Sequence, residues 1–394
     1  MDIERVDIVT VSGSGARIHW RARGPAQFSA SCVCTRTQAP QTARVRTCGQ
    51  RYHLAEFVNL QPATQYTFQI ACAGQAAACY TGHFKTLRIP AGPFRFRFAT
   101  VNDIHVGEEE YGLIMLPGMG NISLTPGLRC EIQGKPFWQF TNEQAIRELN
   151  ALDLDFVIVK GDLTTDPTTE NMERARAMFD TLAHPYHVLR GNHDHPGAMP
   201  RDTFFDTFGA DKTWYSFEHK GAGFVLLDCI HPRTGYLYFP GPELDWLQAE
   251  LARLAHRPVF VFLHTPPMRV FERTPRSRVN RFMSILKAHA NLAGVFYGHT
   301  HANKRVSRVC AGRRVPFVET AATMDYPGGF NIYDVHANGY MQTCLRPFDA
   351  PCCQWFEKAE SAYYGLARSV LSGRIRDRNF TAPVHPHIAK NSGG

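Results

Sequence analysis

Apolar and polar positions alternate over short segments through residues 1–92. Residues 16–21 show this alternation, with Ile18 and Trp20 at apolar positions and arginines between them. Gly, Pro or Thr separates one segment from the next, and no window has the i, i+3, i+4 spacing of an amphipathic helix. A period of two is typical of strands that bury one face. The pattern therefore predicts an all-β sandwich over residues 1–92.

The spacing Leu-x-Pro-x-Thr-x-Tyr occurs once in this region, from Leu60 to Tyr66. It resembles the tyrosine-corner segment of fibronectin type III domains, which implies a sandwich of that type. Residues 89–93 follow with two prolines and predict a stiff linker, because proline cannot donate a hydrogen bond to a strand ladder.

From residue 94 onward, apolar runs of strand length alternate with amphipathic stretches. The predicted strands cover residues 94–101, 156–159, 186–189, 224–227, 259–263 and 295–297. Helices are predicted over residues 141–152, where Thr141 and Gln144 suggest a capping box, and over 243–255, 278–290 and 357–371. Buried strands separated by helices indicate an α/β fold. We expect a β-sandwich over 1–92, an α/β domain over 93–346, and a C-terminal helix and tail over 347–394.

Five short polar motifs each follow a predicted strand. They are Asp103-Ile104-His105, Gly161-Asp162, Gly191-Asn192-His193-Asp194, His264 and Gly298-His299-Thr300-His301. Because the carboxyl ends of strands in an open α/β sheet share one crevice, the motifs predict a single site.

The side chains of these motifs include two aspartates, four histidines and one asparagine with the character of metal ligands. Oxygen and imidazole donors in this mixture suit Mn, Fe, Zn or Co, and the absence of cysteine argues against a structural zinc. In an extended segment, Asp103 and His105 would project to the same side and bind one ion. His299 and His301 would also share a side if their segment is extended, and they would serve either the same ion or different ions.

Together, the five motifs resemble the signature of calcineurin-like binuclear metallophosphoesterases over roughly residues 94–346. The Asp-x-His and Gly-Asn-His-Asp motifs resemble those of bacterial cyclic nucleotide and glycerophosphodiester phosphodiesterases. This resemblance implies an αββα sandwich with two metal ions. One ion would be held by Asp103, His105, Asp162 and His301, and the other by Asp162, Asn192, His264 and His299. Asp162 would bridge them, and His193 would contact substrate, oriented by Asp194.

A β-sandwich before such a domain also resembles the purple acid phosphatases, but two positions differ. Those enzymes carry a tyrosine ligand where Thr165 stands, and they have no histidine at the place of His105. We therefore expect no tyrosinate-ligated iron centre.

Two divalent ions, two carboxylates and a shared hydroxide leave roughly one positive charge, which suits a small anionic phosphoester substrate. The expected reaction is hydrolysis of a phosphodiester by a metal-bridging hydroxide, with His193 as the proton donor to the leaving group. A phosphomonoesterase with the same site is the alternative. A remote alternative is a catalytically dead core whose sandwich serves as an interaction module.

Three features leave the choice of substrate open. The stretch 107–140 is long for a βα connection, and its aromatic residues would either stack on a substrate ring or pack the loop down. These are Tyr111, Phe137, Trp138 and Phe140. Five arginines in residues 268–282 would either steer a phosphate or be solvated: Arg269, Arg273, Arg276, Arg278 and Arg281. His195 is either a substrate contact or a loop residue, and His385 and His387 are expected to belong to a disordered tail.

Charge and cysteine content narrow the class of protein. Residues 1–92 hold ten Lys/Arg against four acids, but alternating strands place arginines on the solvent face, so neither nucleic acid nor a membrane is an expected partner.

The eleven cysteines lack paired CxxC motifs, which favours free buried thiols over disulfides or a metal site. No apolar run reaches the roughly 18 residues of a membrane span, and the first residues lack a signal-peptide pattern. We expect a cytoplasmic protein, and the family resemblance allows a homo-oligomer.

Overall fold

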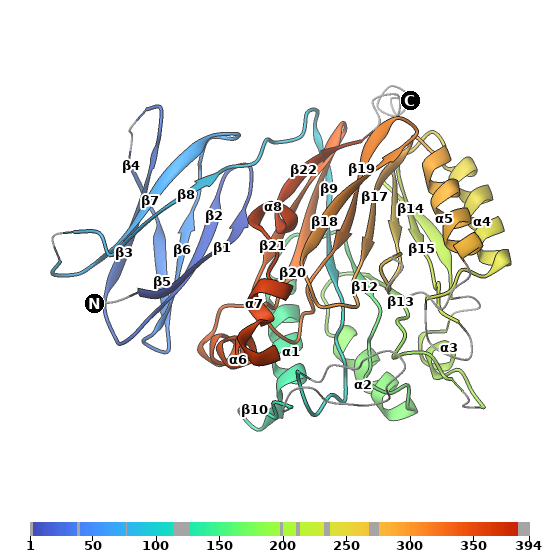
Figure 1. Ribbon diagram of the computed structural model, residues 1–394, viewed down its shortest axis with the longest axis horizontal. Helices are drawn as coiled ribbons and strands as arrows, with labels where there is room; N and C mark the ends of the chain where they lie inside the picture. Colours follow the sequence, from blue (N-terminus) through green and yellow to red (C-terminus); the bar gives the residue numbers. More distant parts are fainter. Residues whose placement is uncertain are drawn as a thin grey trace.

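The computed structural model describes residues 3–37, 40–75, 77–112, 127–197, 200–209, 213–231, 237–267 and 276–384. It consists of an N-terminal all-β part and a larger part in which two sheets lie between helices (Figure 1). Among the described residues, no helix has both the length and the apolar character needed to cross a bilayer.

The N-terminal part is a sandwich of two four-stranded antiparallel sheets. One sheet has the order β1 (Ile3–Val11), β2 (Ala16–Ala22), β6 (Tyr52–Phe57), β5 (Arg44–Cys48). The other has the order β4 (Pro40–Thr42), β3 (Phe28–Cys34), β7 (Gln65–Cys72), β8 (Tyr80–Lys85). Ile18, Trp20 and Phe68 are buried between the sheets, as the period of two predicts. The all-β sandwich is confirmed.

The tyrosine corner is formed as its spacing suggests. The backbone N–H of Gln61 donates to the hydroxyl oxygen of Tyr66 at 2.9 Å, and Tyr66 is 1% exposed. A buried tyrosine hydroxyl needs a polar partner, and this contact supplies it within the same corner. The fibronectin type III label itself stays a prediction.

The larger part contains two six-stranded mixed sheets. The first has the order β13 (Tyr186–Leu189), β12 (Phe156–Lys160), β9 (Phe94–Val101), β20 (Phe330–His336), β21 (Gly339–Leu345), β22 (Phe380–Pro383). The second has the order β14 (Tyr215–His219), β15 (Ala222–Leu226), β16 (Val259–Phe262), β17 (Leu292–Tyr297), β19 (Arg313–Glu319), β18 (Lys304–Cys310). Strands β9, β12 and β13 are parallel, as are β15, β16, β17 and β19.

Both faces of each sheet are covered, so the predicted αββα arrangement is confirmed. Phe98, Phe260 and Tyr333 belong to an aromatic core between the two sheets. Alternate residues of the same strands, such as Val157 and Val261, face the outer helical layers. These layers include α1 (Phe137–Asn150) and α2 (Thr169–Phe179) on one side, and α4 (Gly241–Arg253) and α5 (Arg276–Ala288) on the other. The predicted strands read as continuous apolar runs because both of their faces are buried.

All four helix predictions differ from the structure in their bounds. Helices α4 and α5 each begin and end two residues before the predicted positions, and the other two predictions differ more. Helix α1 begins four residues before Thr141, whose hydroxyl donates to the carbonyl oxygen of Phe137 at 2.8 Å instead of capping the helix. The predicted helix 357–371 is two helices, α6 (Ala350–Glu360) and α7 (Ala367–Leu371), separated by a turn in which Tyr364 has a φ of 56°. Helix α6 is capped by Asp349, whose side chain accepts from the N–H of Cys352.

The C-terminal segment returns to the first sheet. After α7 come the short helix α8 (Ile375–Arg378) and strand β22, which pairs with β21. Helix α8 carries Arg378, which is 3% exposed and donates to the carboxylate of Asp7 in β1. Arg346 donates to the same carboxylate at 3.0 Å. Asp7 therefore joins the N-terminal sandwich to the sheet that carries β9 and β12.

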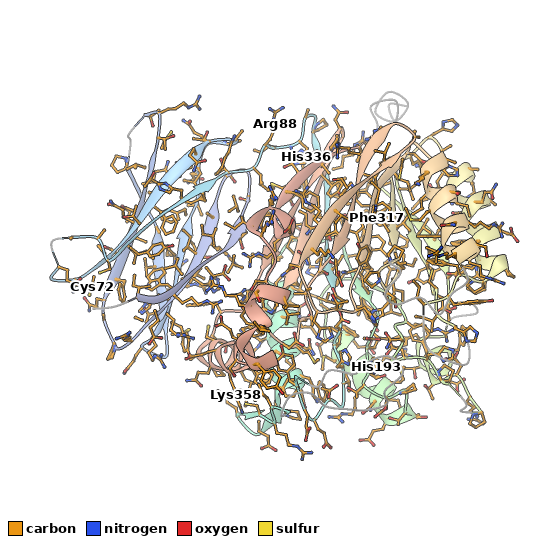
Figure 2. The ribbon with its side chains drawn as sticks, viewed as in Figure 1. Cys72, Arg88, His193, Phe317, His336 and Lys358 are labelled. Atoms are coloured by element: carbon orange, nitrogen blue, oxygen red, sulfur yellow. The ribbon has the colours of Figure 1, made fainter. Side chains whose placement is uncertain are left out.

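Burial opposes the ionisation of Asp7, but the guanidinium groups of Arg346 and Arg378 outweigh it and hold the pKa of Asp7 well below its usual value. All eleven cysteines are free thiols; seven are buried, as expected, whereas Cys48, Cys79, Cys130 and Cys353 are only partly buried. Arg88 and His336 lie at one end of the sheets, and His193 lies toward the other (Figure 2).

Candidate metal centre

Two groups of three side chains at the carboxyl ends of the strands have the geometry of metal sites. In each group, one ligand atom from every residue lies within 4.8 Å of the others. The groups are Asp103, His105 and His301, and Asp162, His264 and His299. The motifs predicted one shared site, and β9 and β12 of the first sheet and β16 and β17 of the second all contribute to it, as the predicted αββα arrangement allows. The site thus lies where the two stacked sheets end together.

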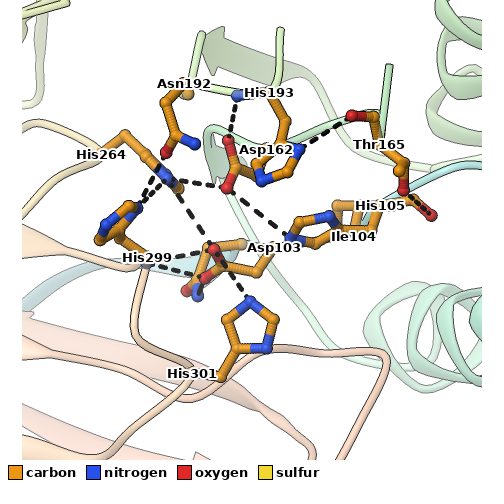
Figure 3. A network of polar contacts seen from close by, with 12 residues as sticks. Asp103, Ile104, His105, Asp162, Thr165, Asn192, His193, His264, His299 and His301 are labelled. Carbon is orange, nitrogen blue, oxygen red and sulfur yellow. Dashed lines mark hydrogen bonds and ion pairs between the residues drawn. The ribbon is translucent and has the colours of Figure 1, made fainter. Parts of the chain in front are cut away.

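Asp162 lies between the two groups (Figure 3). Its Oδ2 is 3.6 Å from Nε2 of His105 and 3.0 Å from Nε2 of His264. Oδ1 of Asn192 is 2.8 Å from Nδ1 of His299. All seven predicted metal ligands therefore meet in one place, and Asp162 is within reach of both groups.

The backbone at these residues differs from the expected extended segments. Asp103 and His105 have φ values of 53° and 49°, and Asp162 has 50°. His299 and His301 have φ values of 84° and 56°. Left-handed backbone costs energy for residues with a side chain, and it persists only where surrounding contacts impose it. The period-of-two argument was wrong, and a tight turn at each strand end aims these side chains instead.

Glycines before the ligands permit the close approach of these turns. A Cβ at Gly161 would lie 2.7 Å from the N of Gly191 and 2.8 Å from Nδ1 of His264. A Cβ at Gly298 would lie 2.6 Å from Oδ2 of Asp103. Only glycine fits at such distances. In the Gly-Asp and Gly-His pairs of the sequence, the glycine is therefore required by the lack of room for a side chain, and the Asp or His by its donor atoms.

Partners behind the histidines determine which ring nitrogen faces the site. Nδ1 of His264 donates a hydrogen bond to the carbonyl oxygen of Lys160 at 2.9 Å, so Nε2 is the ring nitrogen that faces Asp162. Nδ1 of His301 is 2.6 Å from Oδ2 of Asp325, which leaves Nε2 3.6 Å from Asp103. Carboxylate and carbonyl partners of this kind orient imidazole ligands.

Two residues that hold the ligands in place could not be recognised from the sequence. Asp325 belongs to no motif, and Asn102, whose Nδ2 donates to Oδ2 of Asp103, reads as an ordinary polar residue after a strand. Both become recognisable only through their contacts, because each lies far along the chain from some of its partners. Nδ2 of Asn102 also lies 3.2 Å from the carbonyl oxygen of Thr320.

His193 lies beside the two groups, but its partner differs from the expected one. Its Nδ1 donates to the carbonyl oxygen of Thr165 at 2.8 Å. The carboxylate of Asp194 instead accepts from the N–H groups of Gly191, Leu163 and Thr164 at 2.7 to 3.0 Å. Asp194 thus holds the loop that carries His193 against the strand-end turn of Asp162.

The pKa values show how strongly the charges are coupled. Burial opposes protonation of His264 and His301, but Asp162 raises the pKa of the first to about 9, and Asp325 with Asp103 raises that of the second to about 10. Burial and the neighbouring His264 lower the pKa of His299 to about 3. The carboxylates thus stabilise positive charge at this place, as protons on two of the imidazoles in the metal-free protein.

The residues fit a pair of divalent cations. Both ring nitrogens of His105 are buried without a hydrogen-bond partner, although a buried polar atom ordinarily has one. Nε2 of His105 points toward Asp162, and a cation would satisfy it. The donors are carboxylates, imidazoles and an amide oxygen, the set preferred by mid-series divalent metals.

The predicted substrate-selecting aromatics are packed inside the protein. Tyr111, Phe137, Trp138 and Phe140 are at most 7% exposed and belong to the core under the first sheet. Phe137 stacks on Trp355 of α6. Packing, the alternative to substrate stacking, is therefore confirmed for these four residues. Residues 113–126 of the same stretch lie outside the described residues.

The described arginines of α5 face other partners. Arg278 donates to the carbonyl oxygen of Phe239 at 2.8 Å, and Arg281 pairs with Asp245. Arg276 is exposed at the start of α5, and Arg269 and Arg273 lie outside the described residues.

His195 accepts from the N–H of Gly197 at 2.9 Å and thereby holds its own turn. His385 and His387 also lie outside the described residues.

Comparison with known proteins gives the family. A family model described as calcineurin-like phosphoesterase matches residues 96–303, which is over half of the chain. The chain belongs to the calcineurin-like phosphoesterase family. The match spans every one of the seven clustered ligands and His193. The resemblance inferred from the five motifs is confirmed.

Individual relatives are distant. A 3',5'-cyclic-nucleotide phosphodiesterase of Nostoc sp. is 26% identical over 215 residues, which cover 50% of this chain and 79% of the relative. A glycerophosphodiester phosphodiesterase of Enterobacter lignolyticus is 24% identical over 170 residues, covering 41% of this chain and 61% of the relative. The crystal structure of a dimetal phosphatase from Danio rerio superimposes with a TM-score of 0.52 at 16% identity, over 65% of this chain and 98% of that one. That likeness concerns the fold.

Proposed function

We propose that this protein hydrolyses phosphodiesters at a binuclear metal centre. The observation that carries the proposal is the position of Asp162, whose carboxylate lies 3.6 Å from Nε2 of His105 and 3.0 Å from Nε2 of His264. A carboxylate between two groups of donors is suited to bridging a pair of cations. The relatives named as phosphodiesterases support a diester substrate over a monoester.

Each side chain then has a task. Asp103, His105 and His301 would hold one cation, and His264, His299 and Asn192 the other, with Asp162 shared. The metals would be drawn from Mn, Fe, Zn and Co. When bound, such a pair supplies a water of lowered pKa as nucleophile and a clamp for the phosphoryl oxygens.

His193 is suited to protonate the leaving alkoxide. Its Nδ1 donates to the carbonyl oxygen of Thr165, so Nε2 is the atom available to a substrate. Burial opposes protonation of His193, but the carboxylate of Asp162 outweighs it and raises the pKa of the imidazole. A protonated imidazole near neutral pH is an effective general acid. Asp194 would act on it indirectly, by holding its loop.

A rate comparison tests the proposal. Bis(p-nitrophenyl) phosphate, p-nitrophenyl phosphate and a 3',5'-cyclic nucleotide are supplied to the protein loaded in turn with Mn, Zn, Fe or Co. We expect a higher kcat/KM for a diester than for the monoester with at least one metal. A preference for p-nitrophenyl phosphate would favour the phosphomonoesterase alternative. Absence of turnover with every metal would favour the scaffold alternative and contradict the proposal.

A further inference from the structure

A groove of about 970 Å³ lies between the start of β18 and the C-terminal helices α7 and α8. One wall comes from the chain just after His301, including Ala302, Asn303 and Lys304. The other comes from residues 365–377, and α8 packs against β18 (Figure 1). The groove is large enough for a nucleotide-sized molecule.

The groove has an excess of positive charge. Lys304, Arg368 and Arg374 line it, and among the described residues no carboxylate lies within 4.0 Å of their charged groups. Two acids, Glu319 and Asp377, also line the groove, and Lys304 lies directly opposite Glu319 in the pairing of β18 with β19. Glu319 also accepts from the N–H and hydroxyl of Thr300, and Asp377 accepts from the backbone N–H of Arg374. Arg368 and Arg374 thus remain as the cations of the groove without a carboxylate partner among the described residues, and such cations at one hollow favour an anionic ligand.

The wall of the groove is held in place by Asn303. Asn303 is 4% exposed, and its Oδ1 accepts from the N–H of Ala321 at 3.2 Å. Its backbone N–H donates to the carbonyl oxygen of Leu371 at 2.8 Å, which ties the start of β18 to α7. The two walls of the groove are therefore fixed relative to one another.

The rim of the groove is apolar. Leu366 and Val370 line it and are 59% and 61% exposed. A ligand that matches both features carries an anionic group for the two arginines and an apolar or aromatic portion for these two side chains.

The groove differs from the metal centre in the direction that its side chains face. His299 and His301 turn toward Asp162 and Asp103, whereas the side chain of Thr300 between them bonds Glu319 in the groove. From the two arginines without a carboxylate partner, the size of the groove and its apolar rim, we infer that this groove is a second binding site, for an organic phosphate. The site lies against the loop that carries two metal ligands, and it is independent of hydrolysis.

Equilibrium dialysis with adenosine 5'-monophosphate as probe tests the inference. The full chain is used both metal-loaded and after chelation, because chelation removes phosphate binding at the metal centre. We expect one bound nucleotide per chain to remain after chelation. The double variant Arg368→Glu/Arg374→Glu should weaken this binding by at least about tenfold, since charge-assisted contacts are lost and repulsion is added. Inorganic phosphate, which cannot reach the apolar rim, should bind more weakly than the nucleotide.

Arg376→Glu is the matched control, because Arg376 is exposed on α8 but does not line the groove. It should leave nucleotide binding unchanged. Metal-loaded wild-type protein should bind one more nucleotide per chain than the metal-loaded double variant. The inference is overturned if the metal-loaded wild type and the metal-loaded double variant bind the same number of nucleotides, or if Arg376→Glu weakens binding as much as the double variant does. It is also overturned if the chain captures anionic vesicles but binds no nucleotide. Hydrolysis of bis(p-nitrophenyl) phosphate, measured in parallel, reports on the proposed function separately.

Discussion

Oδ2 of Asp325 lies 2.6 Å from Nδ1 of His301, although 24 positions separate the two residues in the sequence. Asp325 is completely buried, and its carboxylate leaves Nε2 of His301 facing Asp103. A contact of this kind fixes the ring orientation and raises the basicity of the imidazole. Asp325 therefore belongs to the machinery of the site as a positioning residue.

Asp325→Asn should weaken metal binding without unfolding the protein. The amide keeps the shape of the side chain but removes its charge, and we expect the affinity for one cation to fall by about 10- to 100-fold. Metal content after dialysis against graded chelator measures this. Asp245→Asn, at an exposed side chain on α4, is the control. Unchanged metal affinity in the Asp325 variant would contradict the positioning role.

Asp162→Asn should impair both cation sites together, because its carboxylate is in reach of both groups of donors. Activity should fall by at least about a hundredfold, since even indirect metal partners are worth about 10- to 100-fold. Elemental analysis and diester hydrolysis check the two effects. The nearby Asp166→Asn, whose residue is exposed, should retain both properties. Survival of full metal content and hydrolysis in the Asp162 variant would remove the catalytic assignment.

His193→Ala should slow substrates with poor leaving groups most. We expect kcat for an alkyl phosphodiester to fall by about 10²- to 10⁴-fold, as for loss of a general acid. The loss with bis(p-nitrophenyl) phosphate should be much smaller, because p-nitrophenolate leaves without a proton. Since the pKa of His193 is raised and its protonated form is the active one, wild-type activity on the alkyl ester should decline as pH rises through that pKa. Equal losses for both leaving groups would rule out proton donation.

Asp7→Asn should loosen the junction between the sandwich and the first sheet. The change leaves Arg346 and Arg378 without their shared carboxylate, and we expect a loss of about 1–3 kcal/mol in the free energy of unfolding. The pKa of Asp7 is depressed in the folded protein, so its stabilisation is complete above the unfolded pKa of about 4 and is lost as the pH falls below that value. Urea unfolding between neutral and acidic pH measures both effects.

Urea unfolding over the same pH range compares the wild type with the Asp7→Asn variant. The Asn variant should lose less stability on acidification than the wild type, because it has no carboxylate to protonate at this position. Asp180→Asn, at a half-exposed ion pair on the protein surface, should leave the pH dependence as it is. A parallel acid response of wild type and Asp7 variant would show that this junction does not titrate.

Much of the fold was readable along the chain, for a local reason. Strands such as β12 and β16 lie within one residue of the bounds that their apolar runs predict, because burial on both faces requires apolar residues at consecutive positions. The start of α1 was missed, because three of the four residues in its first turn, 137–140, are aromatic and give no local helix signal; Phe137 there stacks on Trp355 of α6.

The residue types of the site were also determined by the sequence alone. Each motif already contains the glycine that allows a close approach, as before Asp162 and His299, and the imidazole or carboxylate that the chemistry needs. Tertiary structure decided how these motifs meet: which strands of the two sheets carry each group of donors, left-handed turns rather than extended segments, and Asp325 behind His301. Those features depend on contacts between residues far apart in the chain. Their energies exist only once the sheets have packed, so no short window of sequence records them.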